Sequence, residues 1–188
     1  MKDFDSVVKN IGEFGAFQKK IFYGVQMTSF SLNLQMLVLV FAAAQPKWSC
    51  LEGFSSAPCT KTGAICPKAR FSSDFTSIAT EWNLVCGQAY KNELVQSVFM
   101  AGTMLGAPLL GKMTDLHGRK KMWMISVTGG LLLSFLSAFA TSYNMFVVLR
   151  FVAGLFVGGE RLVTYVLSTE TVGPSYRGKS QCAVFTTV

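Results

Sequence analysis

Long apolar stretches, separated by short polar connections, dominate the pattern along this chain. They cover residues 21–44, 94–111, 122–140 and 145–167. A helix needs about 20 residues to cross the hydrocarbon core of a bilayer, and backbone amides within lipid must be hydrogen-bonded inside their own segment. The pattern predicts an all-α membrane protein with transmembrane helices over 21–44, 93–112, 122–141 and 145–168. Residues 180–188 are predicted to begin a fifth helix.

Composition supports a membrane protein over a soluble domain. The 188 residues are 51% hydrophobic and 14% charged, whereas soluble domains carry about 25% charged residues. So few charges cannot cover the surface of a soluble domain of this size. The first apolar stretch is too long for a signal peptide, begins about twenty residues into the chain and has no small-residue cleavage site after it.

The net charge of +7 raises the alternative of a nucleic-acid-binding protein. The basic residues do not form a stripe with aromatic side chains, so nucleic acid is not an expected partner. They flank the apolar stretches instead, and the connections that are dense in basic residues alternate along the chain with one that is not. Since cytoplasmic loops are rich in Lys and Arg, we expect 1–20, 113–121 and 169–179 on the cytoplasmic side and 45–92 on the extracellular side. The cytoplasmic group is Lys2, Lys9, Lys19, Lys20, Lys112, Arg119, Lys120, Lys121, Arg177 and Lys179.

The predicted extracellular loop contains most of the cysteines. Cysteines on an oxidising face usually form disulfides, which predicts two bonds in this loop with three pairings open. Four free thiols are the alternative. A zinc site is not expected, because there is no close cysteine pair and the only histidine, His117, lies on the opposite side. The four candidates are Cys50, Cys59, Cys66 and Cys86.

A short motif lies between the second and third predicted helices. Residues 111–121 read GKMTDLHGRKK. One interpretation is a solvated basic loop. The string also resembles the G-x-x-x-D-x-x-G-R-[KR]-[KR] signature of the major facilitator superfamily, carried there at the same place. That resemblance implies a charge latch between Asp115 and Arg119 that helps to hold the outward-facing state. Leu116 and His117 differ from the usual basic and aromatic residues. The signature positions are Gly111, Asp115, Gly118, Arg119 and Lys120.

Further strings resemble one family within that superfamily. MKDFD at 1–5, GEFG at 12–15 and TEWNLVC at 80–86 resemble solute carrier family 22, and MFVVL at 145–149 and TETVG at 169–173 resemble its organic cation and carnitine branch. The resemblance implies twelve transmembrane helices in two six-helix halves, a plasma-membrane location and no enzymatic activity. It also implies alternating-access transport of small organic cations, carnitine-like zwitterions or, as an alternative, organic anions.

The fourth apolar stretch has a face of one charge and small residues. Arg150, Gly154 and Gly158 are four apart, so they share a helix face, and small residues at this spacing permit close packing in lipid. A buried charge is a functional candidate, although Arg150 near the helix start has the alternative of extending to the interface. The resemblance places Arg150 and Gly154 in a helix-four signature associated with coupling. Glu170 and Arg177, at the end of this helix, are interpreted as a cytoplasmic gate.

Deeper in the same stretch are two adjacent charges that point in different directions. Arg161 and Tyr165 share one face, and Glu160 and Thr164 share another. The resemblance places Arg161 and Tyr165 at the substrate cavity, where a basic side chain attracts a carboxylate. We therefore expect substrate-binding roles for Glu160, Arg161 and Tyr165. A structural ion pair is the alternative. Asn33, near the middle of the first helix, is a further candidate.

No cofactor is expected, and coupling to Na⁺ or to the membrane potential is left open. Residues 173–180 fit G-x-x-x-x-G-K-S, the phosphate-binding loop. That loop requires a preceding strand, whereas a predicted membrane helix precedes it here, so ATP is not an expected partner. Four helices and the start of a fifth cannot enclose a cavity between two halves. The sequence therefore predicts either an incomplete chain of a transporter or a short membrane fragment that does not transport.

Overall fold

The computed structural model describes residues 15–45, 48–50, 69–71, 76–84, 86–171 and 178. Its long helices are α2 (Ala16–Ala42), α4 (Tyr90–His117), α5 (Arg119–Ser137) and α6 (Tyr143–Thr171). A short helix α3 (Ile78–Glu81) and a 3₁₀ turn (Cys86–Gln88) lead into α4. By length and composition, two described helices are suited to cross a membrane, Lys19–Ala42 and Cys86–His117. The predicted helical class is confirmed.

A small sheet adds to the predicted helices. Strands β1 (Trp48–Cys50) and β2 (Ala69–Phe71) pair antiparallel, with Ser49 opposite Arg70. They lie within the segment predicted as the cysteine-bearing loop. Aromatic residues such as Trp48 and Phe71 favour strands, but three residues are too few for hydrophobic periodicity to identify one.

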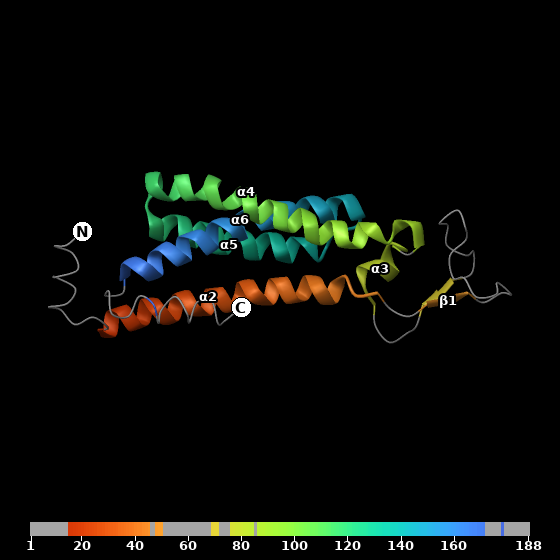
Figure 1. Cartoon of the computed structure of the whole chain (residues 1–188), viewed down its shortest axis with the longest axis horizontal. Helices are drawn as coiled ribbons and strands as arrows, with labels where there is room; N and C mark the ends of the chain where they lie inside the picture. Colours follow the sequence, from red (N-terminus) through yellow and green to blue (C-terminus); the bar gives the residue numbers. More distant parts are fainter. Residues whose placement is uncertain are drawn as a thin grey trace.

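The helices α4, α5 and α6 form a bundle, and α2 runs beside them (Figure 1). The helices α4 and α6 are parallel: the Tyr143 hydroxyl donates to the Lys91 carbonyl at 2.8 Å, and Gly102 faces Gly154 further along. Helix α5 runs the opposite way, since Trp123 bonds Thr164 while Gly130 lies against Val157. The α3 helix lies at one end of the bundle, and β1 lies further out beyond that end (Figure 1).

The connection between α4 and α5 is much shorter than the predicted loop 113–121. Helix α4 continues to His117 and α5 begins at Arg119, so Gly118 alone makes the turn. Its φ of 91° lies in a region that side chains with a Cβ rarely adopt, which explains the glycine. The flanking residues have no proline or other helix breaker, so both helices extend into the stretch expected to be loop.

Glycines allow the backbones of α4 and α6 to touch. A Cβ at Gly106 would lie 2.0 Å from the Leu155 carbonyl oxygen, and one at Gly158 would lie 2.1 Å from the Thr103 carbonyl oxygen. These distances are too short for any Cβ, so the packing needs glycine. We call this contact the glycine seam; it consists of Gly102 and Gly106 on α4 and Gly154 and Gly158 on α6.

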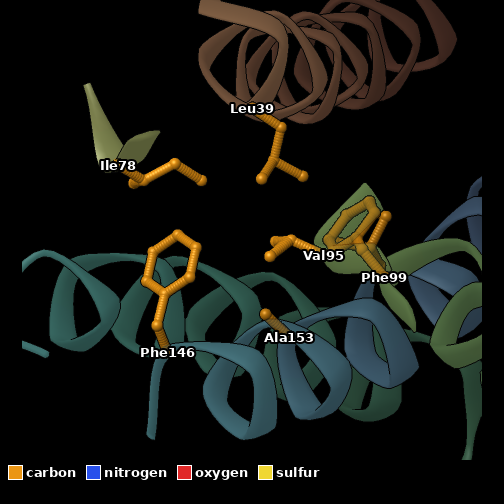
Figure 2. Close-up of a cluster of buried hydrophobic side chains, with 7 residues drawn as sticks. Leu39, Ile78, Val95, Phe99, Phe146 and Ala153 are labelled. Atoms are coloured by element: carbon orange, nitrogen blue, oxygen red, sulfur yellow. The ribbon is translucent and has the colours of Figure 1, made fainter. Parts of the chain in front are cut away.

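A cluster of buried apolar side chains joins α2 and α3 to the bundle. Figure 2 shows Leu39 and Ile78 pointing toward Val95 and Phe146. The side chain of Asn92 donates a hydrogen bond to the carbonyl of Ala43, just after α2. This end of the bundle is therefore fixed by helices that are distant in sequence. The full cluster is Leu39, Ile78, Val95, Phe99, Phe146, Ala153 and Val157.

Candidate functional site

The central turns of α6 present one polar face that other described helices do not cover. Arg161 is exposed, and Tyr165, one turn later, is 42% exposed. Residues four apart lie on the same side of a helix, so Arg161 and Tyr165 share one face of α6, which we call the Arg161 face. The structure thus brings together the two residues that the sequence placed on one face.

Glu160 lies elsewhere. Its side chain is 2% exposed, as is that of Thr164 one turn later. The indole N–H of Trp123 on α5 donates to the Thr164 hydroxyl at 3.2 Å, which shows that this side of α6 packs on α5. Glu160 therefore does not share the Arg161 face. Asn33 is half-buried on α2, a separate helix.

Arg150 is buried near the start of α6, with 6% of its side chain exposed. Its guanidinium carbon lies 5.1 Å from the centroid of the Phe146 ring. A ring face attracts a cation at this distance. Phe146 therefore stabilises the buried guanidinium of Arg150, as a carboxylate does in an ion pair. Because the side chain is buried, the structure does not support the alternative in which Arg150 extends into water.

An ion pair joins the beginning of α5 to the last turns of α6. Arg119 contacts Glu170, and the side chains are 36% and 49% exposed. The latch between Asp115 and Arg119 that the resemblance implied stays a prediction; Asp115 is exposed near the end of α4. The one-residue turn explains the contact with Glu170, because it places Arg119 at the first position of α5, beside α6.

The remaining signature residues support this packing. A Cβ at Gly111 would lie 2.8 Å from the Leu162 side chain, so Gly111 lets α4 approach α6 near the ion pair. Lys120 is exposed.

Arg177, the other predicted gate residue, lies outside the described residues, as do Cys59, Cys66, the start of the fifth helix and most of the 173–180 string.

Cys86 is disulfide-bonded and has a φ of 57°. Cys50 ends β1. The pairing of the four candidate cysteines stays a prediction. Within the part of the chain that the structure describes, His, Cys, Asp and Glu residues do not gather in groups of three or more that would hold a metal ion.

We expect the Arg119–Glu170 pair to make a small contribution to stability. Both groups are partly exposed, so reversing one charge, as in Arg119→Glu, should lower the free energy of unfolding by about 0.5–1 kcal/mol. The double reversal Arg119→Glu/Glu170→Arg should restore it. Thermal unfolding of the purified protein in detergent measures the effect, with Lys120→Glu as the control. Equal losses in the single and double variants would show that the pair is not a stabilising contact.

The structure is a bundle of long helices with close glycine packing, and two of the described helices are suited by length and composition to cross a membrane. The Major Facilitator Superfamily profile matches residues 73–187. The chain belongs to the major facilitator superfamily, which consists of multi-pass membrane carriers and not of enzymes.

Individual relatives agree with this assignment. The chain is 34% identical over 180 residues to organic cation/carnitine transporter 4 of Arabidopsis thaliana, covering 93% of this chain and 34% of the relative. It is 33% identical over 175 residues to solute carrier family 22 member 15-like of Xenopus tropicalis, covering 93% and 35%. It is 35% identical over 119 residues to organic anion transporter 3 of Mus musculus, covering 61% and 21%. The chain spans about a third of the length of the first two relatives. The predicted family resemblance is confirmed.

Two features of the site were not predicted from the sequence. The Trp123–Thr164 hydrogen bond joins α5 to α6, and the glycine seam needs Gly102 and Gly106 as well as the predicted Gly154 and Gly158. The signal for the seam was present, because both helices have glycines four apart. The signal for the hydrogen bond was absent, because one sequence gives no register between helices.

Proposed function

We propose that this chain forms part of a plasma-membrane carrier that moves small organic cations or carnitine-like zwitterions by alternating access. The family assignment and the similarity to organic cation/carnitine transporter 4 of Arabidopsis thaliana support the proposal. In this proposal α2, α4, α5 and α6 are the first four transmembrane helices, the N-terminus is cytoplasmic, and 180–188 begins the fifth. Residues of the remaining two thirds of such a carrier would complete the cavity.

The observation that carries the proposal is the Arg161 face. An arginine binds a carboxylate through two parallel hydrogen bonds, and a tyrosine ring attracts a quaternary ammonium group. Arg161 and Tyr165 are one turn apart and exposed. A solute with a carboxylate at one end and a quaternary ammonium at the other contacts both side chains, which favours a zwitterion over a simple cation.

An organic anion is the second candidate. A relative named organic anion transporter 3 matches 61% of the chain, and a guanidinium alone favours a carboxylate. The two candidates differ in the need for an ammonium group on the solute. Uptake of carnitine, tetraethylammonium and p-aminohippurate by cells that express a full-length carrier containing this chain separates them. Preferred carnitine uptake supports the proposal, preferred p-aminohippurate uptake supports the anion alternative, and no uptake of any probe contradicts both.

We expect Arg161→Ala in that full-length carrier to shift selectivity toward tetraethylammonium. Loss of a charged hydrogen bond costs about 1.5–3 kcal/mol, so the ratio of carnitine to tetraethylammonium uptake should fall by at least about tenfold. Competition uptake measures the ratio. Lys121→Ala, which removes an exposed charge at the start of α5, should leave it unchanged. An unchanged ratio in Arg161→Ala would remove Arg161 from the binding site.

The Arg119–Glu170 pair fits a gate on the cytoplasmic side of such a carrier. It joins the α4–α5 turn to the end of α6, so separation of these ends must break it. In this proposal the pair stabilises the state in which the cytoplasmic side is closed, and Arg177 is a further member of the gate.

A further inference from the structure

Two buried polar side chains lie in the α5–α6 contact. Ser126 on α5 is 0% exposed and Glu160 on α6 is 2% exposed. Among the residues that the structure describes, neither the Ser126 hydroxyl oxygen nor Glu160 Oε1 has a hydrogen-bond partner. Buried polar atoms are nearly always bonded, and among the described side chains that have such an unbonded buried atom, Glu160 is the one acid.

The register of the two helices places Ser126 and Glu160 at the same level. On one side of them, Trp123 bonds Thr164. On the other side, a Cβ at Gly130 would lie 3.8 Å from Phe156 and 3.9 Å from Val157. Ser126 is three residues after Trp123 and four before Gly130, while Glu160 is four before Thr164 and three after Val157. Side chains at these spacings share a face, so Ser126 and Glu160 lie at the same level on the facing sides of α5 and α6, without a hydrogen bond between them.

No described basic side chain is buried against this carboxyl. Arg161 is the adjacent residue, but it is exposed on the Arg161 face. Charged side chains in the last two turns of α4 and at the starts of α2 and α5 are exposed. Arg119, at the start of α5, is partly exposed and pairs with Glu170. The exposed groups are Lys112 and Asp115 on α4, Lys120 and Lys121 on α5, and Lys19 and Lys20 on α2.

An ionised carboxylate at such a place has a high energetic cost, because it is buried away from water and the counter-charge that acts on it, Arg161, is itself exposed. A protonated carboxyl is neutral and donates a hydrogen bond to a neighbouring hydroxyl. Sodium is a poor alternative, because hard cations require several oxygen ligands, and among the described residues no group of three or more His, Cys, Asp or Glu side chains gathers around Glu160.

We propose that Glu160 is a proton-binding site between α5 and α6, and that the carboxyl, once protonated, turns to donate to the Ser126 hydroxyl, to which it is not bonded in this structure. The proton comes from water when the α5–α6 contact opens, attaches to a carboxylate oxygen of Glu160, and returns to water at the next opening. Proton binding is therefore linked to the movement of α6 against α5. The link to solute transport rests on the proposed function, whereas the proton site itself does not.

The first test measures proton retention without transport. In the unfolded chain the carboxyl meets water and ionises in mildly acidic solution. The proton held by the folded protein therefore stabilises it at low pH, and this advantage is lost as the pH rises. We expect the melting temperature of the purified full-length carrier in detergent to fall by about 4 °C or more between pH 6 and pH 9. Glu160→Gln should remove most of this fall.

Controls keep this test specific. Glu93→Gln, at an exposed acid in the first turn of α4, should keep the wild-type pH dependence. Replacing NaCl by KCl should leave the melting temperatures unchanged. A Glu160→Gln variant with the full wild-type fall, or stabilisation by Na⁺ that depends on Glu160, would overturn the proposal. If Glu160→Gln does not fold, the infrared carbonyl band of a protonated carboxyl in the wild type decides: its absence at neutral pH contradicts the site.

The second test examines the link to transport. With any solute that the carrier takes up, the uptake rate of the wild type should change at least about threefold across the same pH range, and that of Glu160→Gln should not. Ser126→Ala removes the hydrogen-bond acceptor and should shift the wild-type pH profile toward acid. An unchanged profile in Ser126→Ala would remove Ser126 from the site. One combined outcome would retain the proton site and reject its link to transport. In it, Glu160→Gln removes the pH dependence of the melting temperature, but uptake by the wild type does not depend on pH.

Discussion

Gly106→Ala is expected to lower the free energy of unfolding by about 3 kcal/mol. The added Cβ would lie 2.0 Å from the carbonyl oxygen of Leu155, which is backbone and cannot rotate away. The helices α4 and α6 must therefore separate along the whole glycine seam. Thermal unfolding in detergent and the amount of monodisperse protein recovered from membranes both measure the loss.

Gly24→Ala provides the matched control. A Cβ at Gly24 meets no atom within 4 Å, and alanine favours a helix by up to about 1 kcal/mol relative to glycine. The same chemical change should thus leave stability unchanged or slightly raised on α2, and lower it strongly on α4. If both variants unfold alike, close contact between the α4 and α6 backbones is not what holds these helices together.

Phe146→Ala is expected to have a similarly large effect, lowering stability by about 3–5 kcal/mol. The ring is buried in the cluster of Figure 2, lies 5.4 Å from the ring of Trp82 on the chain after α3, and covers the guanidinium of Arg150. Its removal leaves a cavity and a buried cation without its ring. Phe139→Ala should change stability by less than about 1 kcal/mol, because Phe139 is 64% exposed.

A double-mutant cycle separates the two contributions of Phe146. Phe146→Leu keeps much of the apolar volume but has no ring, and Arg150→Met keeps the length of the side chain but has no charge. We expect a coupling energy of about 1–2 kcal/mol between the two changes. Additive effects would show that the ring stabilises the protein only by packing.

The long helices were predictable from the sequence because a bilayer imposes a minimum length on each apolar run. The extent of the α4–α5 turn was not predictable in the same way. Polar residues such as Lys112 and Asp115 indicate a loop in a hydropathy pattern, but they are also acceptable in a helix that extends beyond the membrane. Only the backbone shows that Gly118 makes the turn alone.

The site shows the same division between local and long-range information. Helical geometry separates Glu160 from Arg161 on the sequence alone, since adjacent residues point in different directions. It does not say which of the two faces is buried, because that depends on the position of α5. For a related reason, the Arg119–Glu170 contact was not predicted. Asp115 is near in sequence, whereas Glu170 is brought near by the packing of α5 on α6.

The single-residue link at Gly118 has a mechanical consequence for α4 and α5. Because a single residue connects them, a tilt of one helix moves the end of the other. We therefore expect α4 and α5 to move together as one rigid unit. It also leaves no room for an inserted epitope, which would push apart the first residue of α5 and its ionic contact with α6. This hairpin is therefore a poor place for a reporter of sidedness.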